Sequence, residues 1–314
     1  MSAVDERATA YDRSRPCERE RFDGMTAADV LTRPTNRPLE STPTIKIGFE
    51  RAASPDCLAL IAADAWSLFA ERNLAISLVL LPLPRTGIAA LTEGDCELAL
   101  IEPLQLLDQP AADLETLGGV VRVTGGLMMR EDRLRALTEG DTLRIAAPVA
   151  GAGVTGLCRR MLQGWAARQG LAIAGETIQV VAATLSGEDC LAAGYDGVWW
   201  PQSAAEGVAT RIAGSSVRLI AAEDGGVRML PGLELVARRA RTAEESGRHE
   251  AVIAAIDAAA SRLQQEPDRA VDLWLQYART SGPDAEQVVR ASLARMCSPL
   301  DRRPDRWRGL RALI

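Results

Sequence analysis

Residues 142–170, TLRIAAPVAGAGVTGLCRRMLQGWAARQG, carry the pattern that decides the fold class of this chain. They predict a buried strand, a glycine-rich turn and an amphipathic helix, in that order. Gly151, Gly153 and Gly156 follow the G-x-G-x-x-G spacing, which brings a polar group up to the N-terminus of a helix. Two functions fit this stretch. It could hold the pyrophosphate of a dinucleotide, or it could form one side of a cleft that closes on a small solute.

The composition excludes several classes of function. The chain has 314 residues, 47% of them hydrophobic, which is enough for two packed lobes. Its net charge of −6 gives no reason to expect nucleic acid as a partner. Lys46 is the only lysine and His249 the only histidine, which removes the P-loop lysine, H-E-x-x-H zinc sites and most histidine-based triads. We therefore expect no catalytic residues, no metal and no cofactor.

Cysteine usage and hydropathy bear on the location of the protein. The six cysteines are scattered without a C-x-x-C pair, which is typical of a reducing compartment. No stretch approaches 18 uncharged apolar residues, so we expect no membrane span. Residues 1–24 lack the apolar core of a secretory signal. These features predict a cytoplasmic protein, or a periplasmic one if the start site is misannotated.

After a charged arm at 1–43, which we expect to be disordered, strands and helices alternate along the chain. This rhythm predicts parallel sheets with helices on their faces. The expected strands are 44–49, 75–81, 97–102, 143–149, 178–184 and 198–200. The expected helices are 54–72, 86–93, 157–169, 187–193, 251–267, 268–279 and 283–297. Two longer extended segments, 118–132 and 217–240, are interpreted as crossings between two lobes.

Two phrases of the sequence repeat each other in outline, ALTEGDCELALIEPLQLL (90–107) and CLAAGYDGVWWPQSAAEG (190–207). Each has a short helix, a glycine with a nearby acid, an apolar strand, a proline after the strand and a new helix. Because the phrases stand at corresponding points of two β-α-β runs, they indicate two similar lobes.

The order of these pieces resembles the type II periplasmic-binding-protein fold. It is similar in particular to the family that binds aliphatic sulfonates, taurine, nitrate and thiamine precursors for ABC importers. The matching pieces are IKIGFE (45–50), ALTEGDCELALIEP (90–103), TLRIAAPVAGAG (142–153), VWWPQSAA (198–205) and EPDRAVDLWLQYA (266–278). Where that family has G-L-F-x-x-x-G-L, this chain has Ser67 and Asn73 at the two glycines.

The resemblance implies an α/β, two-lobed fold in which each lobe is a mostly parallel sheet flanked by helices, with two crossovers. Lobe I would comprise 44–129 and a helical part at 223–314, and lobe II would comprise 130–222. A small polar ligand such as a sulfonate, an oxyanion or a heterocycle would close the cleft between them. The implied partner is an ABC permease, or a regulatory protein if the chain is a ligand sensor.

Nine residues are expected to line this cleft: Glu50, Arg51, Ser54, Glu102, Gly151, Gly153, Thr155, Trp200 and Gln202. The first four follow strands of lobe I, where the resemblance places the cleft. The next three would offer N–H groups and a hydroxyl at a helix N-terminus. Neighbouring side chains on a strand point to opposite faces, so one of Trp199 and Trp200 should be core and the other a platform for ligand.

Several alternatives remain open at this point. Glu50 or Glu102 could instead cap a helix or pair with Arg51, and the glycines could serve packing alone. Cys57, in the first turn of its helix, could act as the nucleophile of a desulfinase-like C–S lyase. Finally, Gly151, Gly153 and Gly156 could bind a dinucleotide, although the following strand ends without the acid that would hold the ribose.

Overall fold

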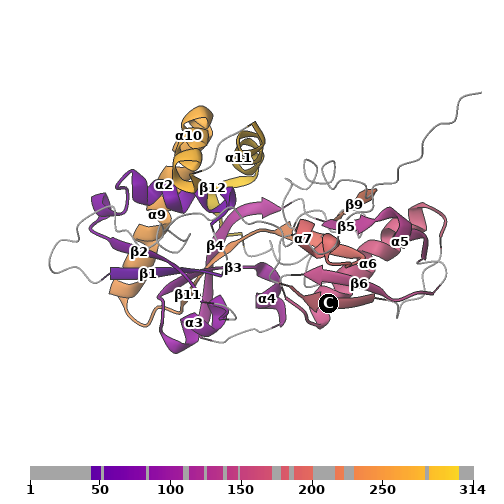
Figure 1. Ribbon diagram of the computed structural model, residues 1–314. Helices are drawn as coiled ribbons and strands as arrows, with labels where there is room; N and C mark the ends of the chain where they lie inside the picture. Colours follow the sequence, from indigo (N-terminus) through magenta and orange to yellow (C-terminus); the bar gives the residue numbers. More distant parts are fainter. Residues whose placement is uncertain are drawn as a thin grey trace, which may run out of the picture.

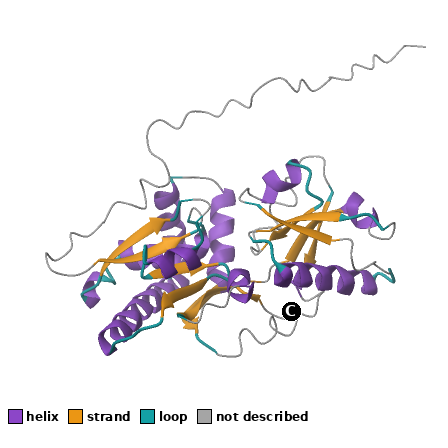
Figure 2. Cartoon of the chain, turned by 90° about the horizontal axis from the view of Figure 1, so that it is seen from below, coloured by secondary structure: helices purple, strands orange, loops and turns teal. Residues whose placement is uncertain are grey.

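The structure, a computed structural model, describes residues 44–50, 53–82, 85–108, 113–123, 126–136, 140–147, 149–171, 178–183, 187–200, 216–222, 230–279 and 283–303. Within these ranges the chain forms two β-sheets with helices on their faces, and the two sheets lie side by side (Figures 1 and 2). The first sheet takes strands from both ends of the described chain, whereas the second is built from its middle part.

The first sheet has seven strands among the described residues, in the order β10-β4-β11-β3-β1-β2, with β12 paired to β4. β1 pairs in parallel with β2 and β3, and β11 lies antiparallel between β3 and β4. The strands are β1 (Thr44–Phe49), β2 (Ala75–Leu80), β3 (Leu98–Ile101), β4 (Leu114–Val123), β10 (Leu230–Pro231), β11 (Glu234–Arg238) and β12 (Met296–Asp301).

The second sheet has five strands in the described part of the chain, in the order β7-β6-β8-β5-β9. β6 pairs in parallel with β7 and β8, and only β5 runs against its neighbours. The strands are β5 (Gly126–Arg130), β6 (Leu143–Ala147), β7 (Ile178–Ala182), β8 (Gly197–Trp200) and β9 (Val217–Ala221). The segments expected to cross between lobes thus each divide into strands of both sheets.

Helices cover both faces of each sheet. One face of the first sheet packs against α2 and α9 and the other against α3, while α6 and α7 cover opposite faces of the second sheet. The helices and helical turns are η1 (Pro55–Cys57), α2 (Leu58–Ala65), η2 (Ala70–Arg72), α3 (Gly87–Glu93), α4 (Pro103–Asp108), α5 (Glu131–Ala136), α6 (Ala152–Arg168), α7 (Gly187–Ala192), α9 (Ala243–Gln265), α10 (Pro267–Ala278) and α11 (Pro283–Arg295).

α6 begins five residues earlier than the helix expected over 157–169, so part of the expected glycine-rich turn is helical. Gly151 is the N-cap, and its carbonyl oxygen accepts the N–H of Thr155 at 3.0 Å. Val154 is buried in the same apolar stripe as Leu157, and this burial extends the helix into the glycine-rich residues. Gly151 therefore starts the helix, and Gly153 and Thr155 lie within its first turns.

The helix expected over 54–72 is interrupted. The turn η1 leads into α2, which ends at Ala65, and the short turn η2 follows. The interruption falls at Ser67, whose φ of 60° lies in the left-handed region and cannot continue a helix. Asn73 has a φ of 57°. Both positions, where the resembling family has glycine, therefore keep a backbone that glycine adopts readily.

Two further helix boundaries differ from the expectation. α9 begins before residue 251 because Thr242 and Glu245 form a capping box: Thr242 Oγ1 accepts the Glu245 N–H at 3.1 Å, and Glu245 Oε2 accepts the Thr242 N–H at 3.3 Å. His249, expected to precede this helix, therefore lies inside it. The helix expected over 283–297 ends two residues early, and β12 follows beside β4.

Candidate functional site

Both connections between the sheets join the carboxyl-terminal ends of their parallel strands. β4 ends at Val123, and β5 begins at Gly126 after two intervening residues. Gly126 pairs with Trp200 and Ala221, the last residues of β8 and β9, and on the return path Leu230 pairs with Val123. The carboxyl ends of β1, β3 and β4 and those of β6, β8 and β9 are thus directed toward the same connections. We call them the facing ends, and open α/β sheets bind ligands at such ends.

Glu50 follows β1 directly, and both of its carboxylate oxygens accept hydrogen bonds. Its Oε1 accepts the N–H of Gly87, the first residue of α3, at 2.5 Å. Its Oε2 accepts from Nε2 of Gln105, a buried residue of α4, also at 2.5 Å. Glu50 therefore connects the end of β1 to α3 and α4. This agrees with the alternative in which Glu50 caps a helix. Its role toward a ligand stays a prediction.

The other expected residues of the first sheet surround the same ends. Glu102 follows β3, is half-buried, and accepts the Gln105 N–H with its backbone oxygen at 3.0 Å. Ser54 is half-buried and takes the N-cap position of η1, where its backbone oxygen accepts the Cys57 N–H at 2.8 Å. Arg51 lies outside the described residues. The structure therefore brings Glu50 and Glu102 to neighbouring strand ends, with α4 between them and the second sheet.

The N-terminus of α6 is the corresponding feature of the second sheet. Gly151 supplies no side chain to cap the helix, and the first turn contains no acidic residue. In contrast, Thr86 caps α3 with its hydroxyl, which accepts the Ala89 N–H at 3.2 Å. Thr155 is half-buried and Gly153 is buried. The positive end of the dipole of this 17-residue helix therefore favours an anionic or hydrogen-bond-accepting group.

Helices next to the two halves of the expected site are in contact. α4, which begins directly after Glu102, packs against α6. Of the two adjacent tryptophans of β8, Trp199 is buried in the core at 3% exposure, which confirms that one of the pair is a core residue. The side chain of Trp200, and the whole of Gln202, lie outside the described residues.

The thiol alternative gains no support from the surroundings of Cys57. The side chain is buried, and this burial raises the pKa of the Cys57 thiol to about 12. The nearby Asp56 carboxylate acts in the same direction. The thiol is therefore protonated at neutral pH, whereas a nucleophilic cysteine needs a lowered pKa.

The dinucleotide alternative gains no support either. In such sites an acidic residue at the end of the second strand binds the ribose. Here that strand is β7, which lies parallel to β6, ends at Ala182 and continues with Ala183. Gly156 lies inside α6, beyond its first turn.

Sequence reasoning missed the partners that hold Glu50. Gln105 lies three residues after Glu102. The sequence indicated only that it belongs to a short helix, and not that its amide contacts Glu50. Thr86 and Gly87 carry a usable signal, since threonine before an apolar run is a common N-cap. Arg295 was also missed: its Nη2 donates to the Asp56 carboxylate beside η1 at 3.0 Å. No sequence signal links these two residues, because they are 239 positions apart.

A family model described as NMT1/THI5 like matches residues 54–270. The chain belongs to the NMT1/THI5-like family. The match runs from the residue before η1, through both sheets, into α10. A search of the curated proteins finds no match.

Solved structures share the fold of this NMT1/THI5-like protein. The alkanesulfonate-binding protein SsuA from Xanthomonas axonopodis pv. citri, bound to MOPS, is 21% identical, with a TM-score of 0.60 over 87% of this chain and 91% of that one. The periplasmic aliphatic sulphonate binding protein SsuA from Escherichia coli is 17% identical, with a TM-score of 0.56 over 82% and 85%. The ligand-binding component of an ABC-type import system from Staphylococcus aureus, with zinc bound, is 16% identical, with a TM-score of 0.62 over 86% and 90%. These structures confirm the two-lobed α/β fold.

The names of these structures also bear on the expected function. All three are named as binding proteins or binding components, which agrees with the expectation of binding rather than catalysis. The Escherichia coli protein is named as periplasmic, so the expected cytoplasmic location finds no support there. Among the described residues of this chain, no helix is both long and apolar enough to cross a membrane.

Proposed function

We propose that this NMT1/THI5-like protein is a solute-binding protein that holds a small polar molecule between the facing ends of its two sheets. The observation that carries this proposal is the position of both connections, which join the sheets at the carboxyl ends of their parallel strands. Because both connections lie at one edge, the sheets can close on each other by a hinge motion. A ligand held there contacts both lobes and is enclosed when they close.

The N-terminus of α6 supports an acidic or acceptor-rich ligand. Its first turn has neither a capping side chain nor an acidic residue, and Thr155 adds a hydroxyl. On the opposite side, both carboxylate oxygens of Glu50 already accept hydrogen bonds at 2.5 Å. Because Glu50 is held by Gly87 and Gln105, its charge is partly compensated there. We propose a sulfonate or another oxyanion, with its charged group at the N-terminus of α6.

A thermal-shift screen tests this binding function. The panel contains MOPS, taurine, other sulfonates, inorganic oxyanions, pyrimidines and amines at millimolar concentration. A ligand at 100 times its Kd stabilises the folded state by about 2.7 kcal/mol, which gives a clear rise in melting temperature. If no compound of the panel stabilises the protein, the proposed ligand class is wrong.

Substitution of Thr155 tests the location of the site. Thr155→Val keeps the shape of the side chain but removes the hydroxyl, and loss of one hydrogen bond should weaken ligand binding roughly 3- to 10-fold. Thr92→Val, at an exposed position in the last turn of α3, is the matched control and should leave affinity unchanged. Equal affinities in the Thr155→Val and Thr92→Val proteins would move the site away from the start of α6.

We further propose that the protein is the binding component of an ABC importer, acting outside the cytoplasm. The Staphylococcus aureus neighbour is named as such a component, and this supports transport over sensing. Fractionation of cells that express the native gene with a C-terminal epitope tag tests the location. Recovery of the tagged protein only with cytoplasmic markers would contradict transport and favour the sensor.

A further inference from the structure

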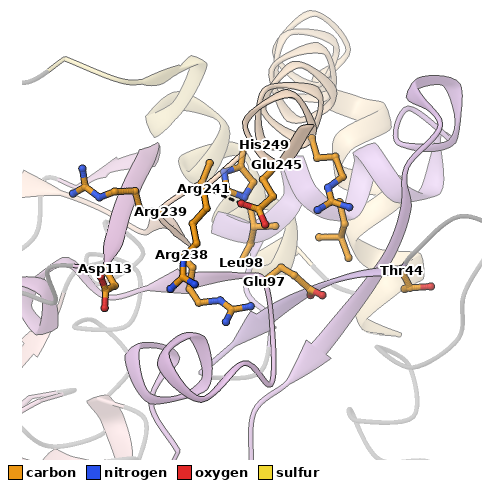
Figure 3. Close-up of a pocket in the computed structure, with 12 residues that line it drawn as sticks. Thr44, Glu97, Leu98, Asp113, Arg238, Arg239, Arg241, Glu245 and His249 are labelled. Atoms are coloured by element: carbon orange, nitrogen blue, oxygen red, sulfur yellow. Dashed lines mark hydrogen bonds between the residues drawn. The ribbon is translucent and has the colours of Figure 1, made fainter. Parts of the chain in front are cut away.

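A pocket among the described residues lies away from the facing ends. It has a volume of about 450 Å³ and opens at the opposite, amino-terminal edge of the first sheet (Figure 3). Thr44 and Glu97, at the beginnings of β1 and β3, line it together with Arg238 at the end of the antiparallel β11. The first turns of α9 form another side. A volume of this order accommodates a small organic molecule.

Arginine side chains dominate the charge of this pocket. Arg238, Arg239 and Arg241 come from the end of β11 and the connection to α9, and Arg248 lies on α9. Arg248 is 3.8 Å from Glu244. Within the part of the chain that the structure describes, none of Arg238, Arg239 and Arg241 is within ion-pair distance of a carboxylate. Three guanidinium groups beside the pocket thus make no close ion pair with a described carboxylate.

Three acidic residues, Glu97, Asp113 and Glu245, also line the pocket, and two of them accept hydrogen bonds from backbone N–H groups. Glu97 Oε2 accepts the Lys46 N–H at 2.8 Å. Glu245 Oε2 accepts the N–H groups of Arg241 at 2.6 Å and Thr242 at 3.3 Å. These bonds fix the strand edge and the start of α9, and the bond from the Arg241 N–H, helped by the charges of Arg248 and Arg241, lowers the pKa of Glu245.

His249 adds a buried polar group to the same wall. Its side chain is 13% exposed, and its Nδ1 lies 3.3 Å from Glu115 Oε1. The pair lacks the alignment of a hydrogen bond, so Nδ1 is without a hydrogen-bond partner. Glu115 Oε1 instead accepts the Ala240 N–H at 3.2 Å. A buried imidazole nitrogen without a partner is costly unless another group contacts it.

We propose that this pocket binds a small aliphatic polyanion, a molecule that carries two or more phosphate or carboxylate groups. The planar guanidinium group pairs with such oxyanions through two parallel hydrogen bonds. The lining residues include no Phe, Tyr or Trp, so the pocket offers none of these side chains as a platform for a base or ring. The site is separate from the facing ends and does not depend on the proposed solute site.

The orientation of the arginines selects the residues to test. In Figure 3, Arg238 lies between Asp113 and Glu97 at the strand edge, whereas Arg239 points away from His249 and Glu245. Arg238 should therefore contribute more to polyanion binding than Arg239. Arg160, exposed on α6 of the second sheet, serves as a charge-matched control.

The experiment is calorimetric titration of the protein with inorganic pyrophosphate and with citrate, with sodium chloride at equal ionic strength as the reference. We expect binding of at least one probe, a loss of affinity of about tenfold in Arg238→Gln and in Arg241→Gln, and no loss in Arg160→Gln. Circular dichroism melting without probe checks that each variant is folded.

Three results would overturn the proposal. The first is the absence of heat beyond that of chloride for both probes. The second is an equal loss of affinity in Arg160→Gln, which shows non-specific attraction. The third is a loss in Thr155→Val, which places the polyanion at the facing ends. If Arg238→Gln does not fold, Arg241→Gln and the control Arg160→Gln carry the comparison, and equal affinities in these two would also overturn it.

Discussion

Ser67 and Asn73 adopt backbone conformations that side chains with a Cβ usually avoid. Their φ values are 60° and 57°. In this region the Cβ approaches the following carbonyl oxygen, which costs roughly 1–2 kcal/mol for most residues and less for asparagine. These two residues stand where the resembling family has glycines. The chain therefore keeps the turn geometry at a steric cost.

Replacing Ser67 by glycine should therefore stabilise the protein by about 0.5–1 kcal/mol, and Asn73→Gly should stabilise it less. The greater entropy of glycine in the unfolded chain limits the gain. Urea unfolding of both variants measures the effect. Ser77→Gly, the same change within β2, is the control and should destabilise the protein. Destabilisation in all three variants would contradict the steric argument.

The cysteines form a second set of residues whose behaviour follows from burial. Five of the six are free and buried: Cys57, Cys96, Cys158, Cys190 and Cys297. Burial raises the pKa of Cys96 to about 11 and those of Cys57 and Cys158 to about 12. Cys17 lies outside the described residues. Because the thiolate is the reactive form, the five buried thiols should be inert in the folded protein.

The folded Cys17→Ala variant should therefore react with Ellman's reagent at pH 8 at less than one thiol per chain, and at five after denaturation. The pKa shifts also set a pH dependence. Since the folded pKa values lie above the ordinary value of 9.0, their stabilising effect is complete below pH 9 and is lost as the pH rises toward 12. A rapidly labelled thiol in native Cys17→Ala would show that the core opens or that one of these cysteines is accessible.

At the scale of elements, the strands were easier to predict than the helix starts. β3, with the sequence LALI, is buried on both faces, and such strands read as continuous apolar runs. The starts of α6 and α9 were predicted too late, because the first residue of the periodic apolar pattern was taken as the first residue of the helix. α6 gains its first turn from Gly151 and the buried Val154, and α9 from a capping box whose T-x-x-E spacing is visible at 242–245.

Thr242→Ala removes the side-chain oxygen that caps α9 and should destabilise the protein by about 1 kcal/mol. Thr242→Ser keeps a hydroxyl at the same position and should retain most of the stability. Denaturant unfolding at equal protein concentration compares the two variants with the parent protein. Equal losses in both would mean that packing of the threonine methyl group, rather than the cap, stabilises the start of α9.

At the scale of the whole molecule, one buried ion pair joins the first and last parts of the described chain. Arg295 of α11 donates to Asp56 in η1 at 3.0 Å, and their side chains are 8% and 5% exposed. Arg295 also donates to Ser292 Oγ at 3.1 Å, and its Nη1 has no hydrogen-bond partner. Removing one member of such a pair leaves the other charge buried and uncompensated.

Asp56→Ala should therefore destabilise the protein by about 3–5 kcal/mol. The double variant Asp56→Ala/Arg295→Met should be more stable than Asp56→Ala alone, because no charge remains buried. Glu250→Ala breaks the exposed pair with Arg302 (2.7 Å) and should cost at most about 1 kcal/mol. Urea unfolding compares the parent protein with these three variants, and a double variant no more stable than Asp56→Ala would contradict the coupling.

The fold was predictable at this scale because the order of strands, helices and crossings between the lobes is visible in the sequence. The site was predictable only in part. The positions of Glu50, Glu102 and Gly151 at the facing ends could be predicted because each comes after a strand, and topology directs such residues to one edge. Their role in ligand binding stays a prediction. Gln105, which holds Glu50, and the pocket at the opposite edge were missed. The contact of Gln105 with Glu50 joins residues 55 positions apart. The pocket residues come together through the antiparallel β11 and the start of α9, which periodicity does not reveal.

The pairing of β4 has a consequence for the synthesis of the protein. Its described strand partners are β10, β11 and β12, and all three follow the last strand of the second sheet. About 80 residues separate Ala221 from Asp301, and a ribosome adding ~5–20 residues per second needs on the order of 4–16 s for them. During that interval the nascent chain can complete the second sheet while β4 presents bare backbone edges. Such an edge is a template for pairing with other chains, so this is the stage at which the growing polypeptide most needs a chaperone.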